Sequence, residues 1–329
     1  MSSVINGAAT ERIAQAGKIA AAMRAEIGKA LVGQDEVVEQ TLIALIAAGH
    51  VLIEGVPGLG KTLLVRALAR TFDGNFGRIQ FTPDLMPADV TGHTLYDQST
   101  RQFTTRRGPV FTNLLLADEI NRAPAKTQAA LLEVMQEGQV TIEGQALPLD
   151  PPFMVLATQN PIEQEGTYAL PEAQLDRFLL KVHIDYPSHE QERALVTQVT
   201  AQQIGDKLNV EMVATLIKPS TVIGLQKIAA TLTMDARVVD YAVRIVRATR
   251  TWNGVAAGAG PRGGIALTRA ARAAALVAGR DFVTPDDVKR MALPALRHRI
   301  TPTPELEIEG ASADSILNAI LDKVEAPRA

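Results

Sequence analysis

Glycine, lysine and threonine in one short segment give this chain its clearest chemical signal. Residues 55–62 read Gly-Val-Pro-Gly-Leu-Gly-Lys-Thr and match the pattern G-x-x-x-x-G-K-[S/T] at every fixed position. Glycines allow the backbone to bend closely around phosphate oxygens, so that consecutive N–H groups form an anion nest. Lys61 can reach the outer phosphates of a nucleoside triphosphate, and the Thr62 hydroxyl can hold Mg²⁺. The segment therefore predicts that a nucleoside triphosphate and Mg²⁺ bind here.

The residues on either side of this loop support the same prediction. The apolar run Val51–Ile53 is typical of a short strand, and Thr62–Arg70 has the apolar spacing of a helix. A helix that begins at the loop adds partial positive charge where the phosphates bind. The residues that we expect to contact the nucleotide in this loop are Pro57, Gly58, Leu59, Gly60, Lys61, Thr62 and Leu63.

A second, acidic site is needed for hydrolysis, and the segment Asn113–Glu119 carries two carboxylates at the end of an apolar run. In open parallel sheets, ligands bind at the carboxyl ends of the strands, which is where these acids would lie. Asp118 is predicted to hold Mg²⁺, usually through a water, and Glu119 to polarise the attacking water. Asn160 follows the expected strand Phe153–Thr158 and could orient that water or contact the γ-phosphate; the alternative is a plain turn-forming Asn before proline.

The composition is that of an ordinary globular protein. The chain has 329 residues, enough for about two domains, with 47% hydrophobic and 21% charged residues. Its formal net charge of −3 gives no overall basic field for nucleic acid. The absence of cysteine excludes disulfides and thiolate sites, and the five histidines lack metal-ligand spacing. No apolar run approaches the roughly 18 residues of a membrane span and no signal peptide is evident, so we expect a cytoplasmic protein.

The first part of the chain alternates strand-like and helix-like segments, which predicts a mainly parallel sheet with helices on both faces. An amphipathic helix over Glu11–Leu31 precedes them. Strands are expected at Val51–Glu54, Arg78–Phe81, Leu114–Asp118, Phe153–Thr158 and Phe178–His183. Helices are expected between them at Thr62–Arg70, Ala125–Glu137 and Glu172–Leu175.

Two interruptions break this alternation. Residues 87–109 hold two β-like runs and read as an insertion that forms a hairpin. Residues 137–152 show period-two runs on both sides of Glu143-Gly144-Gln145, which indicates a second hairpin before the next central strand.

After Ser188, which can cap a helix, the chain reads as helices alone. A domain boundary is therefore expected at about residue 187. The expected helices are His189–Gln202, Val210–Ile217, Ser220–Ala229, Asp235–Thr249, Ile265–Gly279 and Pro285–Leu296.

Together these segments resemble a known family, the MoxR-type AAA+ ATPases. The resemblance extends from about Leu31 to about Arg299 and is carried by GVPGLGKT, LLLADEINRAPAKTQAALLEVMQE, LATQNPIEQEGTYALPEAQLDRF, GPRGG and TPDDV. It implies an αβα P-loop core with strand order 5-1-4-3-2, followed by a small helical lid. The expected division is an N-terminal helix at 1–30, a nucleotide-binding core at 31–187 and a lid domain at 188–329, with the 87–109 insert and the 137–152 hairpin inside the core.

The resemblance also implies roles for residues outside the P-loop. Val32, Gly33 and Gln34 resemble the segment that closes over adenine. Asn160 resembles sensor 1, and Arg177 resembles the arginine finger that reaches a neighbouring subunit's nucleotide. Arg262 resembles sensor 2 on the lid. For either arginine taken alone, a surface ion pair is the alternative.

The surroundings of Arg262 depart from the family pattern. Five glycines lie in the segment 254–264, which makes this loop flexible. We therefore expect Arg262 to become ordered only when nucleotide is bound.

The resemblance implies an ATP-hydrolysing ring, a hexamer in this family. The ring would remodel or mature protein partners in a chaperone-like way, by inserting a cofactor or metal or by acting on a von Willebrand A domain protein. A finger supplied to a neighbour implies a head-to-tail interface, and such interfaces can close into rings. The alternatives are a nucleic-acid motor, helicase-like or a transcription activator, and a nucleotide-dependent scaffold without turnover.

The insert at 87–109 carries three arginines, Arg101, Arg106 and Arg107. They form either a solvated face or a contact for a partner or for a neighbour's phosphates. Aromatic residues do not interleave with them, so nucleic acid is the less favoured partner.

Overall fold

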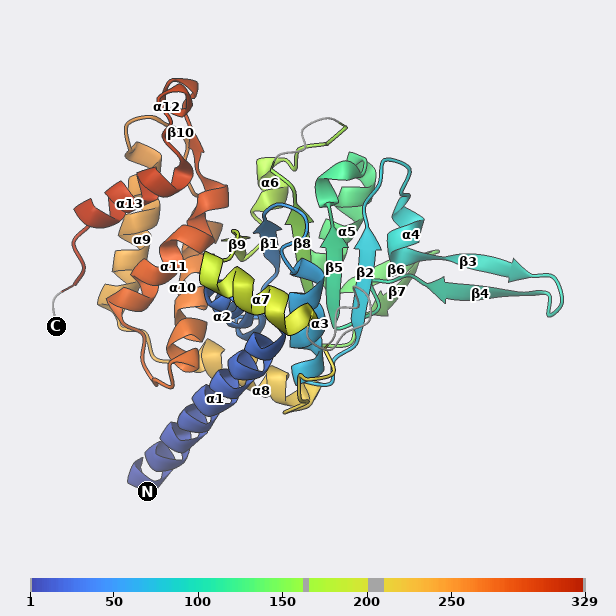
Figure 1. Cartoon of the computed structure of the whole chain (residues 1–329), viewed down its shortest axis with the longest axis horizontal. Coiled ribbons are helices and arrows are strands. Elements are labelled where there is room, and N and C mark those ends of the chain that lie inside the picture. Colours follow the sequence, from blue (N-terminus) through green and yellow to red (C-terminus); the bar gives the residue numbers. More distant parts are fainter. Residues whose placement is uncertain (1, 162–165, 201–209, 328–329) are drawn as a thin grey trace.

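The computed structural model describes residues 2–161, 166–200 and 210–327 and shows an α/β core beside a group of helices (Figure 1). Five parallel strands form the central sheet in the order β2-β5-β8-β1-β9. These strands are β1 (Val51–Glu54), β2 (Phe76–Gln80), β5 (Leu114–Asp118), β8 (Met154–Gln159) and β9 (Leu180–His183). Numbered 1 to 5 along the chain, they lie in the order 5-1-4-3-2, which confirms the predicted fold class and strand order.

The sheet is apolar on both faces because helices cover both. In β5, Leu114 and Leu116 belong to one hydrophobic cluster together with α1, α2 and α3, whereas Leu115 and Ala117 belong to a second cluster with α5. All four side chains are fully buried, as expected for a central parallel strand. The helices of this part of the chain are α1 (Ser2–Ala30), α2 (Asp35–Ile46), α3 (Lys61–Thr71), α5 (Ala125–Glu137) and α6 (Glu172–Leu175).

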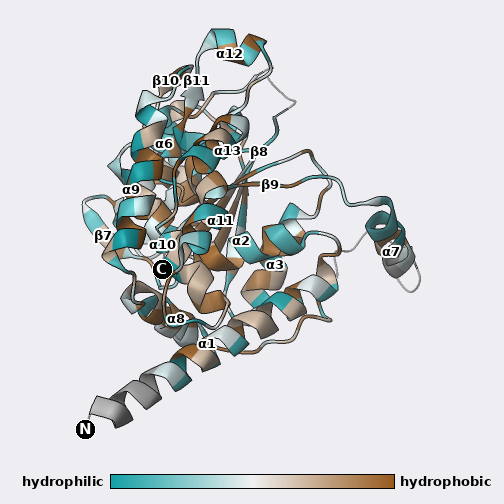
Figure 2. Cartoon of the chain, turned by 90° about the vertical axis from the view of Figure 1, so that its left-hand side faces the viewer, coloured by the Kyte–Doolittle hydropathy of each residue, from teal (hydrophilic) through white to brown (hydrophobic). Residues whose placement is uncertain are grey.

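A group of helices follows the sheet and packs beside β9 (Figure 1). Its members are α8 (Pro219–Thr231), α9 (Ala236–Thr251), α10 (Pro261–Val277), α11 (Pro285–Leu296), η2 (Arg297–Arg299), α12 (Pro304–Ile308) and α13 (Ala313–Lys323). Two short strands, β10 (Val255–Ala257) and β11 (Thr301–Pro302), pair within it. The helix α7 (His189–Thr200) stands away from these helices (Figure 2).

The packing crosses the proposed boundary at residue 187. Both α1 and α8 contact α2 of the core and α10 of the lid. Gly17 of α1 lies so close to Gly279 that an added Cβ would be 2.6 Å from its Cα. One hydrophobic cluster therefore joins helices from both sides of the boundary, and the division into domains stays a proposal.

Both predicted hairpins are present. The insert begins with α4 (Pro87–Thr91) and continues as β3 (Gly92–Asp97) and β4 (Gln102–Arg107), which project on the side away from the lid helices (Figure 1). The second hairpin joins β6 (Gln139–Ile142) to β7 (Gln145–Pro148). Its turn is the pair Glu143-Gly144, with φ of 47° and 78°, one residue shorter than the sequence indicated. A two-residue turn with both φ positive matches the twist of a hairpin.

One predicted helix, Val210–Ile217, is wrong. The segment instead crosses the C-terminal end of α3, where the last carbonyl groups of a helix lack partners within the helix. The N–H groups of Leu216 and Ile217 donate to the Thr71 carbonyl at 2.8 and 3.2 Å. A helix pattern in the sequence was thus overridden by backbone groups that α3 left unpaired. Residues 201–202 of the predicted helix His189–Gln202 lie outside the described residues.

Among the described residues, no helix is both long enough and apolar enough to cross a membrane.

Candidate functional site

The loop between β1 and α3 has the backbone geometry that the glycine pattern predicts. Gly58 and Gly60 have φ of 87° and 81°, in the left-handed region that favours glycine, and Gly60 caps the N-terminus of α3. The position of a Cβ on Gly58 has no atom within 4 Å, whereas on Gly60 it would meet the Leu31 Cδ1 atom at 2.8 Å. The loop therefore opens to space at Gly58, and at Gly60 it lies against the end of α1.

Lys61 and Thr62 begin α3 and line a cavity of about 340 Å³. The Lys61 ammonium donates to the Gly55 carbonyl at 2.5 Å, so the side chain bends back over the loop. Burial lowers the pKa of Lys61, and the nearby charges of Asp118 and Glu119 oppose this shift. The other residues that line the cavity are Pro57, Gly58, Gly60, Arg78, Gln80, Asp118, Glu119 and Asn160.

The two predicted acids stand at the end of β5, next to the loop. Glu119 has φ of 56°, a left-handed conformation that is uncommon for a residue with a side chain and marks local strain. Thr158 on β8 holds both residues, because its hydroxyl donates to Asp118 Oδ1 at 2.6 Å and accepts the N–H of Glu119 at 2.9 Å. The strain at Glu119 is thus maintained by a neighbouring central strand.

Sequence reasoning missed Thr158 and three further side chains that bind these acids. Arg78 donates to Asp118 Oδ2 at 2.7 Å, and Gln80 donates to Glu119 Oε2 at 2.8 Å. Arg122 forms an ion pair with Glu119 at 2.9 Å. A signal was available for Arg78 and Gln80, since they alternate with the apolar Ile79 within the expected strand Arg78–Phe81. In the structure, β2 ends at Gln80 and pairs with β5, which carries Asp118.

Of the remaining predicted nucleotide contacts in and after the loop, some line the cavity and others pack into the hydrophobic cluster. Asn160 is buried, with 7% of its surface exposed, and lines the cavity with Lys61. Leu59 and Leu63 pack against the hydrophobic cluster instead of lining the cavity, so that their contribution would come from the backbone.

Leu31, which precedes the segment Val32–Gln34, lies against the loop at Gly60. Gln34 donates to the Asp185 carbonyl at 2.8 Å, beyond the end of β9, and Gly33 has φ of 79°. Gln34 thereby ties the chain before α2 to the chain that leaves the sheet.

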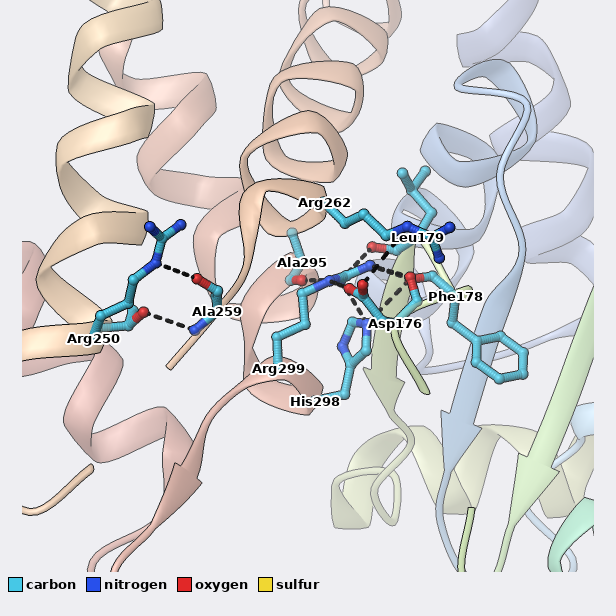
Figure 3. Close-up of polar contacts among 10 residues, drawn as sticks. Asp176, Phe178, Leu179, Arg250, Ala259, Arg262, Ala295, His298 and Arg299 are labelled. Atoms are coloured by element: carbon cyan, nitrogen blue, oxygen red, sulfur yellow. Dashed lines mark hydrogen bonds and ion pairs between the residues drawn. The ribbon is translucent and has the colours of Figure 1, made fainter. Parts of the chain in front are cut away.

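Arg177 and Arg262 lie elsewhere, at a second cavity of about 310 Å³ between the sheet and the lid. The structure brings these two arginines together but separates them from Lys61 and Asp118, because neither arginine lines the first cavity. Arg177 donates to the Leu132 carbonyl at 2.7 Å. Arg262, in the first turn of α10, approaches Asp176 at 3.9 Å (Figure 3).

Two family models match the chain, and the second cavity is lined by residues from both matched ranges. Residues 50–180 match the model of the ATPase family associated with various cellular activities (AAA), and residues 247–320 match the AAA lid domain. The chain is 46% identical over 319 residues to Chaperone MoxR1 of Mycobacterium tuberculosis, an alignment that covers 92% of this chain and 81% of that protein. The chain belongs to the MoxR family of AAA+ ATPases.

Two further relatives and one solved structure are similar to this chain over most of its length. Protein MoxR of Methylorubrum extorquens is 33% identical over 94% of this chain and 95% of its own length, and Uncharacterized protein YeaC of Bacillus subtilis is 46% identical over 92% of each. A crystal structure of a presumed ATPase from Cytophaga hutchinsonii has a TM-score of 0.89 and 41% identity, with both chains covered in full. Membership of the MoxR family implies nucleotide binding, which fits the cavity around Lys61.

Proposed function

We propose that this MoxR-family protein binds ATP with Mg²⁺ and hydrolyses it to ADP and phosphate, as one subunit of a ring. The observation that carries the proposal is the separation of the two sites. Lys61, Thr62, Asp118 and Glu119 share one cavity, whereas Arg177 and Arg262 share another. A subunit on its own thus has a pocket for the phosphates in which Arg78 is paired with Asp118, while the predicted finger Arg177 lies at the other cavity.

Each sequence-predicted polar residue of the first cavity has a role in this proposal. The amides of the glycine loop and the Lys61 ammonium hold the phosphates, while Glu119 and Asn160 orient the attacking water. The Thr62 hydroxyl and the Asp118 carboxylate are hard oxygen donors and fit Mg²⁺, which when bound would neutralise charge on the phosphates. Asp118 is held by Arg78 and Thr158 here, so a magnesium-bound water has to share or replace these contacts.

In a ring, the neighbouring subunit supplies the Arg177 guanidinium. If subunits associate head to tail, Arg177 of one subunit faces the phosphates of the next. In other nucleotide hydrolases a finger supplied in this way contributes roughly 10³–10⁵ in rate. We propose a hexamer because that number is the one implied by the family, and a cytoplasmic location likewise stays a prediction.

The work done by the ring is proposed to be chaperone-like remodelling of a protein client, such as a von Willebrand A domain protein. The name of the relative Chaperone MoxR1 supports this direction. The net charge of −3 weighs against the alternative of a nucleic-acid motor.

The proposal is tested by measuring ATPase turnover per subunit as the protein concentration is raised. We expect turnover to increase with concentration, because assembly delivers Arg177 to the neighbouring pocket. Turnover that is constant from dilute monomer to assembled ring would contradict the trans role. Stimulation by single-stranded or duplex DNA would favour the nucleic-acid motor, and a well-folded ring without turnover would favour a scaffold.

A further inference from the structure

Arg299 is a lid residue whose side chain is buried in the core. It ends η2 and its side chain is only 4% exposed. Figure 3 shows its guanidinium directed at the turn between α6 and β9, which carries Asp176, Arg177 and Phe178. A buried guanidinium is costly unless its N–H groups and its charge are matched by partners.

The partners of Arg299 surround Arg177 on both sides along the chain. Its Nε donates to Asp176 Oδ1 at 2.7 Å, and its Nη2 donates to the carbonyls of Asp176 and Phe178 at 3.0 and 2.7 Å. Its Nη1 approaches the Leu179 carbonyl at 3.4 Å and donates to the Ala295 carbonyl. The peptide group just before Arg177 and the peptide group just after Phe178 are therefore both held by one lid side chain.

Lysine could not make this set of contacts. A guanidinium presents five N–H donors in a fixed plane, whereas an ammonium has three donors at one point. Four carbonyls and one carboxylate around a single side chain therefore favour arginine. The adjacent His298 adds no second positive charge beside Arg299. Burial keeps the pKa of His298 well below its usual value, so its ring is neutral.

The other end of Arg177 is anchored to the core. Its guanidinium donates to the Leu132 carbonyl of α5 at 2.7 Å, while its backbone is held through Arg299. The Asp176 carboxylate is shared, since its second oxygen lies 3.9 Å from Arg262 of α10. Two lid arginines thus meet the core at the residue that precedes the predicted finger.

We propose that Arg299 is a positioning residue for Arg177, tying the lid to the finger turn so that the orientation of the lid sets where the finger points. The inference rests on the proposed function only for the role of Arg177 in a neighbour's site. The physical claim, that Arg299 fixes the turn, is independent of that role.

The first experiment compares Arg299→Lys with Arg280→Lys by hydrogen–deuterium exchange on the full chain. Arg280 is a matched control because it is also a lid arginine, paired with the buried carboxylate of Asp287 and with the Phe282 carbonyl. We expect faster exchange in residues 172–180 for Arg299→Lys alone. Unchanged exchange there, or the same change in both variants, would overturn the proposal.

The second experiment measures ATPase kinetics and nucleotide affinity of the same variants. For Arg299→Lys we expect kcat to fall by about tenfold or more with KM for ATP nearly unchanged, because the variant's own pocket is intact. Mixing it with Lys61→Ala subunits, which carry an intact finger turn, should restore part of the turnover. A loss confined to KM, or no recovery in rings shown to be mixed, would contradict positioning of the finger in trans.

Two outcomes separate this inference from the proposed function. If the wild-type ring binds ATP without turnover, the proposed function fails, while the exchange experiment still decides whether Arg299 fixes the turn. If Arg299→Lys does not fold, Asp176→Asn is used instead, since it retains the carbonyl acceptors and the side-chain shape. It should show the same faster exchange to a smaller degree; exchange equal to wild type would then count against the proposal.

Discussion

The nucleotide cavity and the lid–core junction differ in how their residues are brought together. Lys61 and Thr62 are adjacent in sequence and follow β1, and Asp118 and Glu119 lie at the end of β5. Both strands pair in parallel with β8, so the sheet brings the four residues to one edge, where they line one cavity. The junction joins Asp176 to Arg299 across 123 positions, mostly through backbone carbonyls. The nucleotide cavity can therefore be recognised from side-chain types that lie close together in the sequence. The lid–core junction depends on how two groups of helices pack.

The largest effect is expected at the junction, from Arg177→Ala. Turnover should fall by about 10³–10⁵ because the guanidinium that stabilises transition-state charge is lost, with ATP affinity little changed. The measurement is ATPase rate together with binding of a fluorescent ATP analogue.

Mixing Arg177→Ala with Lys61→Ala sharpens the contrast between the two regions. At a mixed interface, a Lys61→Ala subunit can present an intact finger to an intact pocket, so part of the turnover should return. Absence of recovery in rings proved to be mixed would mean that both regions act within one subunit.

The next largest effect is expected in the nucleotide cavity, from Glu119→Gln. Removal of the carboxylate that polarises water should lower turnover by about 10²–10⁴, while ATP still binds. Here mixing with Lys61→Ala should give no recovery, because the two lesions lie in the same cavity and neither subunit has a complete one. Recovery would mean that Glu119 acts in the neighbour's site, so that the nucleotide cavity and the lid–core junction would no longer differ in this respect.

Much of the fold and of the first cavity could be predicted from sequence, for identifiable reasons. β1, β5 and α5 have the predicted bounds, since apolar runs and helical spacing are local signals. The glycine loop and the acids after β5 belong to fixed motifs. Arg299 gave no such signal, because its partners are mainly carbonyl groups, which every residue carries. The segment 210–217 was misread for the same reason, since its structure follows unpaired carbonyls at the end of α3.

A third prediction concerns His50, which lines the junction cavity. Its Nδ1 accepts the N–H of Val155 and its Nε2 donates to the Met135 carbonyl, an arrangement that suits only the neutral ring. Burial lowers the pKa of His50 to about 4, below the 6.5 expected in the unfolded chain. The unfolded state therefore binds more protons at this residue between these values, and His50 alone should make the free energy of unfolding fall by up to about 1.4 kcal/mol for each unit by which the pH falls.

Urea unfolding of His50→Gln, measured from pH 4.5 to 6.5, tests this dependence. Glutamine offers a donor and an acceptor without titrating. The slope of the free energy of unfolding against pH should therefore decrease by up to the equivalent of one proton, about 1.4 kcal/mol per pH unit. This window avoids Glu54: burial would raise the pKa of its carboxyl, but His183 and Lys181 outweigh burial and lower it to about 2, so its contribution is lost only below pH 4.5. A slope identical to wild type would show that His50 is not held neutral.

The smallest effect is expected from Arg78→Met in the nucleotide cavity. The Arg78 side chain is 48% exposed, so its ion pair with Asp118 should change the free energy of unfolding by less than about 1 kcal/mol. Its consequence should appear in magnesium dependence instead, because Arg78 is a cation that competes for the same carboxylate. We expect the Mg²⁺ concentration for half-maximal turnover to fall by about a few-fold. Arg237→Met, which breaks an exposed pair with Asp235 on α9, is the control. If both variants leave the magnesium midpoint unchanged, Arg78 does not share Asp118 with the metal, and the contacts of the acids in this structure persist when nucleotide binds.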